Sequence, residues 1–205
     1  MNYDTLASEA TLEKVKAGLA ARNFEPIIVE NGAEALEKIK ELIPQGASVM
    51  DGASKTLEEI GFTDYLKSNT HGWNNLHAPI VAEADPAQQQ ELRKKAIHSE
   101  YYLGSVHALT EEGELIISSN SGSQLPNLVS TSSHLILVVG TQKIVSDIAA
   151  GFERLETYIM PIENKRIQEM YGMDTMRAKT VILHRENPMM GRKVVVMLVK
   201  EKLGF

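Results

Sequence analysis

The chain has 205 residues, 43% of them hydrophobic, and a formal net charge of −6, so it is long enough to bury a substantial core. Lysines and arginines are scattered, and there are only one tryptophan and four phenylalanines, which disfavours a nucleic-acid surface. The absence of cysteine excludes disulfides, thiolate nucleophiles and cysteine-ligated metal or iron–sulfur sites. No apolar run approaches the roughly 20 residues of a membrane span and no signal-peptide core is present, so we expect a cytoplasmic protein without membrane contact.

The first quarter of the chain alternates helical and strand patterns. An amphipathic helix covers 5–22, a strand covers 25–30, a helix capped by Asn31 runs to Pro44, and a second strand covers 47–50. This order predicts a parallel α/β sheet with right-handed crossovers. We expect one domain over the whole chain, with the first helix at its periphery.

A turn of small residues follows the second strand and opens another helix. Free amides and the helix dipole converge at such a place and favour an anion, so Ser54, Lys55 and Thr56 are candidate ligand-binding residues. The alternative is that Ser54 and Thr56 only cap the helix. The glycine spacing and the Gly-Lys pair of a Walker A loop are missing.

The next segment, 62–84, predicts a long loop with a short helix, and such loops often cover binding sites. Asp85 then caps a helix that is expected to run to about Tyr101. The six histidines show no spacing typical of a metal site, so we expect no metal and no bound cofactor.

The stretch from Ser105 to Val145 holds most of the candidate site. Apolar runs on either side of Thr110–Gly113 predict a β-hairpin over 105–118. The uninterrupted apolar run 135–139, closed by a glycine, predicts a central strand with both faces covered.

Two adjacent carboxylates, Glu111 and Glu112, occupy the tight loop of that hairpin. In the functional interpretation, one of them points into a cleft and serves as a general base or nucleophile, with Thr110 beside the ligand. In the alternative interpretation, both are solvated surface charges.

A second polar loop follows, and its backbone amides and hydroxyls suit a phosphate or carboxylate. The candidate ligand-binding residues in this loop are Asn120, Ser121, Gly122 and Ser123. Lys143, just after the central strand, would add a positive charge at the carboxyl end of the sheet, where open α/β folds place their sites.

Beyond a helix near 148–155, the sequence predicts a short strand over 158–160 and a helix opened by Pro161. Arg166 in that helix is a further candidate anion-binding residue, and Asn164 in the same helix is also a candidate ligand-binding residue. The chain closes with two apolar runs around a turn, which we interpret as an antiparallel hairpin over 179–199.

Several of these segments together resemble the lactate-utilisation (LUD) domain family, in which an A-x-T-E-x-G-x-L hairpin precedes an apolar strand and a Lys-Ile-Val segment. The resemblance covers nearly the whole chain from about residue 10. It is carried by ALTEEGEL at 108–115, LILVVG at 135–140, KIV at 143–145, SKTLEEIG at 54–61, PIENKR at 161–166 and EKLGF at 201–205.

The resemblance implies a three-layer α/β domain with a mostly parallel sheet, similar to the NagB/RpiA/CoA-transferase-like fold, and a bacterial role in lactate or related organic-acid oxidation. Some short members carry a cysteine cluster suggestive of iron–sulfur binding before the last hairpin. The corresponding stretch here, 171–178, has no cysteine, so no intrinsic redox role is expected. In neighbouring CoA-transferase-like folds a glutamate can be a nucleophile.

Two hypotheses follow. In the first, the protein binds a small anionic metabolite or an oxidoreductase partner with iron–sulfur or flavin subunits, and no chemistry is required. In the second, it is an isomerase or transferase for a phosphorylated or CoA-linked substrate that uses Glu111 or Glu112.

Overall fold

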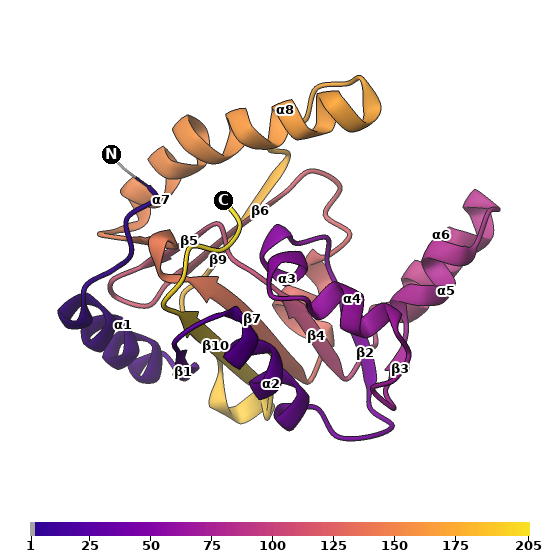
Figure 1. Ribbon diagram of the computed structural model, residues 1–205, viewed down its shortest axis with the longest axis horizontal. Helices are drawn as coiled ribbons and strands as arrows, with labels where there is room; N and C mark the ends of the chain where they lie inside the picture. Colours follow the sequence, from indigo (N-terminus) through magenta and orange to yellow (C-terminus); the bar gives the residue numbers. More distant parts are fainter. Residues whose placement is uncertain (1–2) are drawn as a thin grey trace.

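Figure 1 shows the computed structural model of the protein, in which residues 3–205 are described. The elements follow one another as α1 (Glu9–Ala21), β1 (Glu25–Val29), α2 (Gly32–Leu42), β2 (Ser48–Asp51), α3 (Lys55–Glu59), α4 (Phe62–Lys67), β3 (Asn74–Asn75), α5 (His77–Ala82), α6 (Pro86–Ala96), β4 (Tyr101–Gly104), β5 (Ala108–Thr110), β6 (Leu115–Ser119), the π-helix η1 (Asn127–Thr131), β7 (His134–Gly140), the 3₁₀ turn η2 (Thr141–Lys143), β8 (Ile144–Val145), α7 (Ile148–Arg154), the π-helix η3 (Leu155–Ile159), α8 (Met160–Tyr171), β9 (Lys179–Leu183), the 3₁₀ turn η4 (Pro188–Met190) and β10 (Lys193–Val199).

A six-stranded sheet forms the centre of the molecule, in the order β1-β10-β7-β4-β2-β3, and all of its pairs are parallel. Strands β7 and β10 are interior strands, each with a neighbour on both sides, because their uninterrupted apolar runs need cover on both faces. Helices flank this sheet, so the predicted α/β class with a mostly parallel central sheet is confirmed.

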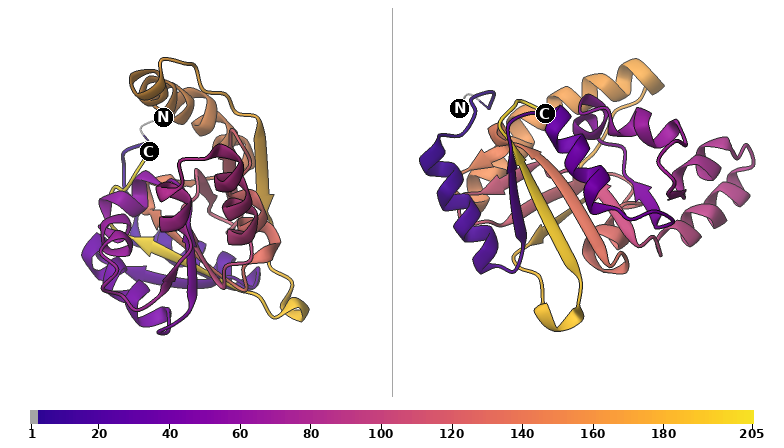
Figure 2. Two further views of the ribbon diagram at one scale, coloured as in Figure 1. Left: turned by 90° about the vertical axis from the view of Figure 1, so that its right-hand side faces the viewer. Right: turned by 60° about the horizontal axis from the view of Figure 1, so that its bottom comes forward.

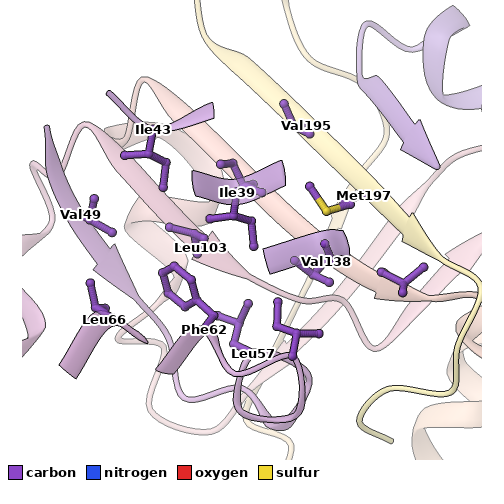
Figure 3. Packing of buried hydrophobic residues seen from close by; sticks show 14 of the residues in the cluster. Ile39, Ile43, Val49, Leu57, Phe62, Leu66, Leu103, Val138, Val195 and Met197 are labelled. Carbon is purple, nitrogen blue, oxygen red and sulfur yellow. The ribbon is translucent and has the colours of Figure 1, made fainter. Parts of the chain in front are cut away.

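The two faces of the sheet bury two separate cores. On one face, Ile39 of α2 packs with Phe62 of α4 against Leu103 and Val138 of the strands (Figure 3). On the other face, α1 and a smaller sheet cover the alternate residues of β7 and β10. Helix α1 belongs to this core, because Leu12 is only 1% exposed.

The smaller sheet has the order β8-β5-β6-β9. Its β5 and β6 pair in antiparallel fashion, which confirms the predicted hairpin over 105–118. Gly113, with φ of +92°, closes the turn, in the left-handed region where glycine is favoured. The far face of this sheet packs against α7 and η3.

The predicted hairpin over 179–199 is wrong. Strand β9 pairs with β6 at the edge of the smaller sheet, whereas β10 lies between β1 and β7 in the large one. Their connection, which contains η4, projects from the body of the molecule in both views of Figure 2. The physical reason is burial: 194–199 is apolar throughout and requires a central position, whereas β9 is only half-buried.

The predicted strand over 158–160 is also wrong, because the chain is helical from α7 through η3 into α8. Pro161 lies in the first turn of α8. A proline lacks an amide hydrogen and clashes with the carbonyl four residues earlier, and the wider π-helical turn before it accommodates both effects.

Two further boundaries differ from those expected. The helix capped by Asp85 ends at Ala96, and Tyr101 begins β4 instead of ending the helix. The segment 62–84 contains α4, β3 and α5 rather than one short helix in a loop. None of the helices within residues 3–205 has the length and apolar character needed to cross a membrane.

We predict that Leu198→Ala lowers the free energy of unfolding by about 2–5 kcal/mol, because it removes fully buried methyl groups from the strand shared by both cores. Urea unfolding measures the change. Met189→Ala is the control, since Met189 is 91% exposed in η4 and its loss is expected to cost less than about 0.5 kcal/mol. Equal effects of the two substitutions would contradict the central position of β10.

Candidate functional site

The carboxyl ends of β2, β4 and β7 meet at one pocket of about 860 Å³, here called the central pocket. Its floor contains Asp51 from β2, Ser105 after β4 and Lys143 after β7. Residues of α5 and α6, the loop after β6, and α8 with its following loop complete the walls. Open α/β sheets bind their ligands at this edge.

Lys143 is the most unusual group of the central pocket, because it is only 2% exposed. Its Nζ donates hydrogen bonds to Thr56 Oγ1 at 2.8 Å and Ser105 Oγ at 3.1 Å. The two hydroxyls donate in turn to the backbone carbonyls of Leu203 and Val138, so their lone pairs face the lysine. No ion pair between side chains of residues 3–205 includes Lys143.

Burial therefore acts on Lys143 with little compensation. Loss of hydration, together with repulsion from Arg154, lowers the pKa of Lys143 to about 7, although attraction from Glu59 acts in the opposite direction. Gly204 packs directly against the site: a Cβ there would lie 2.5 Å from Thr56 Oγ1 and 3.2 Å from the lysine nitrogen. Only glycine allows this approach, and its φ of +63° is also in the left-handed region.

Two buried residues that interact electrostatically with Lys143, His107 and Arg154, supply no negative charge to neutralise it. Burial lowers the pKa of His107 to about 3, with added repulsion from Lys143 and Arg154, so this imidazole is neutral. The Nδ1 of His107 accepts the Ser118 amide hydrogen, which leaves its proton on Nε2. Arg154 is fully buried and donates to the His107 carbonyl, but its Nε and Nη2 have no hydrogen-bond partner within the described chain.

A carboxylate–imidazole pair lies elsewhere in the same pocket. Asp51 is 3% exposed at the end of β2 and accepts a hydrogen bond from Nδ1 of His77, the first residue of α5. This hydrogen bond raises the pKa of His77, and partial burial opposes the shift. The pair resembles the arrangements in which a carboxylate fixes the tautomer and orientation of an imidazole.

The charges around the central pocket favour an anionic ligand. Five lysine and arginine side chains line it against three carboxylates, in a protein whose net charge is −6. The cationic residues are Lys55, Arg93, Lys143, Arg166 and Arg177, and the acidic residues are Asp51, Glu58 and Glu163.

The structure brings most of the predicted ligand-binding residues together. Those that line the central pocket are Ser54, Lys55, Thr56, Asn120, Ser121, Ser123, Lys143 and Arg166. Ser54 also caps α3, as the alternative interpretation required. Arg166 forms a two-pronged ion pair with Glu163, which holds its guanidinium at the wall.

Three predicted ligand-binding residues do not line the pocket. Thr110 is buried in the hairpin and bonded to Glu114, and Gly122 packs on the Lys179 side chain. Asn164 bonds to Asp174 and the Thr175 amide and so holds the loop after α8.

The two predicted catalytic glutamates also lie outside the central pocket. Glu111 and Glu112 both pair with Lys14 of α1, at 3.0 Å and 3.1 Å. Their arrangement is that of surface charges that join the hairpin to α1. Their catalytic role stays a prediction.

Four residues that line the pocket were not among the predicted site residues: Asp51, His77, Tyr102 and Ser105. Asp51 and Ser105 directly follow short strand patterns, and position at a strand end is the signal that could have identified them. His77 is 26 residues from its partner Asp51, and no local sequence pattern predicts such a contact.

Comparison with known proteins decides the family. The family model described as LUD domain matches residues 12–178. The chain belongs to the LUD domain family. The LUD domain therefore contains Lys143, Asp51 and His77, and the resemblance read from the sequence is confirmed.

One solved structure is similar to this LUD domain protein: the crystal structure of a DUF162 family protein from Deinococcus radiodurans. The TM-score is 0.56 and the identity is 11%, and the match covers 95% of this chain and 98% of the other. At this identity the similarity shows the fold alone. A comparison with curated proteins found no match.

We predict that Lys143→Met changes how stability depends on pH. Between pH 7 and 10.5 the unfolded chain keeps a proton on Lys143 that the folded protein has lost, so the wild type becomes more stable as the pH rises. Relative to Lys143→Met, its free energy of unfolding is expected to rise by up to about 1.4 kcal/mol per pH unit.

Urea unfolding at a series of pH values across this interval measures the difference. Lys16→Met, on an exposed face of α1, is the control and is expected to run parallel to the wild type. Parallel curves for Lys143→Met and the wild type would show that Lys143 titrates normally.

Proposed function

We propose that this LUD domain protein binds a small organic-acid anion in the central pocket, with the carboxylate of the ligand against Lys143. The observation that carries the proposal is the burial of Lys143 with two hydroxyl partners and no side-chain carboxylate among residues 3–205. Such a cation gains the most from an anion that arrives with the ligand.

The chemistry of the site agrees with a carboxylate ligand. An ammonium group has three donors, and Thr56 and Ser105 accept two of them. The third donor remains for a ligand oxygen, in a charge-assisted hydrogen bond. A volume of about 860 Å³ is within the usual size of a small-molecule site.

Membership of the LUD domain family supports a function related to lactate utilisation. We therefore place the ligand among lactate, pyruvate and related organic acids. Docking of an oxidoreductase with iron–sulfur or flavin subunits, a bacterial source and a cytoplasmic location stay predictions.

The alternative of a phosphorylated or CoA-linked substrate keeps some support from the cations at the pocket walls. The glutamates predicted to act as its nucleophile add no support, because Glu111 and Glu112 form ion pairs with Lys14 outside the pocket. Phosphorylated compounds therefore belong in the binding experiment as competitors, not as the first expectation.

We predict that isothermal calorimetry detects binding of lactate or pyruvate, and that Lys143→Met weakens it about 10- to 100-fold, the worth of a hydrogen bond to a charged group. Affinity is expected to fall as the pH rises above about 7, where the unliganded lysine loses its proton.

Two controls keep the result specific. Lys16→Met changes an exposed lysine of α1 and is expected to bind as the wild type does. Pyruvamide, the neutral amide of pyruvate, is expected to bind poorly to both. Undiminished binding to Lys143→Met, or equal binding of the acid and its amide, would overturn the proposal.

A further inference from the structure

The pair formed by Asp51 and His77 does not belong to the anion site at Lys143. Asp51 is 3% exposed, and His77 is the only hydrogen-bond partner of its carboxylate within the described residues. The His77 side chain is 32% exposed and lines the central pocket. With its Nδ1 hydrogen directed to Asp51, the imidazole keeps its Nε2 lone pair for a ligand.

A third group, Tyr102, lines the same pocket. The hydroxyl of Tyr102 lines the pocket, is buried, and has no hydrogen-bond partner within residues 3–205. It lies against Gly52, since a Cβ on that glycine would clash with the hydroxyl oxygen. Burial raises the pKa of Tyr102, so the hydroxyl keeps its hydrogen and remains a donor.

We propose that His77, oriented by Asp51, is the acid–base catalyst of the central pocket and moves a proton to and from a ligand carbon that adjoins a carbonyl group. The inference rests on the proposed function, because Lys143 must hold the anionic end of the same ligand. His77 and Tyr102 would be catalytic residues, and Asp51 would be a positioning residue.

The step needs no oxidant or other co-reactant. Nε2 of His77 takes a proton from the carbon, and the electron pair of the broken C–H bond forms a carbon–carbon double bond. The carbonyl electron pair moves to oxygen, which becomes an enolate and accepts the Tyr102 hydrogen bond. In the reverse step the imidazolium returns a proton, after exchange with solvent, to the same carbon or to a neighbouring atom.

The surroundings of His77 set the pH at which it can act as a base. Asp51 raises its pKa, whereas burial and the charges of Lys67 and Arg93 lower it. The unprotonated form is the base, so the rate is expected to rise with pH through the pKa of His77. Removing the Asp51 charge lowers that pKa and moves the rise to lower pH.

A purely structural role for the pair, joining α5 to β2, makes a different prediction. In that case the wild type would not accelerate proton exchange, and substitutions would change only stability or binding. The experiment therefore measures exchange and binding separately on the same protein samples.

Wild-type protein is incubated in deuterium oxide with pyruvate, 2-oxobutyrate or dihydroxyacetone phosphate, and proton NMR follows the signals next to each carbonyl group. Calorimetry measures binding of the same compounds. We expect wild-type protein to accelerate deuterium exchange in at least one compound that it binds.

His77→Gln is expected to slow that exchange by about 10²- to 10⁴-fold, the usual contribution of a general base, while binding changes by only a few-fold. His98→Gln is the matched control, because His98 is exposed and lies outside the pocket. Asp51→Asn is expected to slow exchange and to shift the rise of its pH profile to lower pH. Thermal unfolding confirms that each variant is folded.

The outcomes separate the two proposals. Compounds that bind but exchange no faster with the wild type than with His77→Gln overturn the acid–base role and leave the binding function intact. If neither lactate nor any of the three compounds binds, the proposed function fails and this inference fails with it. An Asp51→Asn profile that loses height without shifting overturns the positioning role of Asp51.

Discussion

The burial of one uncompensated lysine is the constraint from which the functional account follows. Lys143 is held by two hydroxyls, with Arg154 nearby and a neutral His107 behind it. Burying a cation without a partner costs free energy, and an arriving anion recovers part of that cost. The folded protein therefore favours an anionic ligand at Lys143 in the central pocket.

The parallel sheet places the residues of this anion site together. Parallel strands end at a common edge, so Asp51, Ser105 and Lys143 meet there although up to 92 residues separate them in the sequence. Strand β7, which carries Lys143 to this edge, is buried on both faces. Anion binding at Lys143 and proton transfer at His77 would then act on two parts of a single ligand.

Much of the fold was predictable from local patterns, and the errors share a physical cause. Caps at Asn31 and Asp85, the hairpin over 105–118 and the buried strand at 135–139 depend on neighbours in sequence and were correct. The hairpin over 179–199 failed because the partner of a strand is chosen by long-range burial. In the site, position at a strand end identified Lys143. The Asp51–His77 contact depends on tertiary structure alone. The ion pairs of Glu111 and Glu112 with Lys14 of α1 likewise join residues that are far apart in the sequence, so local patterns do not predict them.

A crystal structure of the protein with bound lactate or pyruvate would test the central claim most directly. The account predicts ligand density in the central pocket, with a carboxylate oxygen within hydrogen-bond distance, about 2.7–2.9 Å, of the Lys143 nitrogen. The same crystals of Lys143→Met are expected to lose that density. Saturating ligand bound elsewhere, or a pocket in which Lys143 contacts only Thr56 and Ser105, would contradict the account.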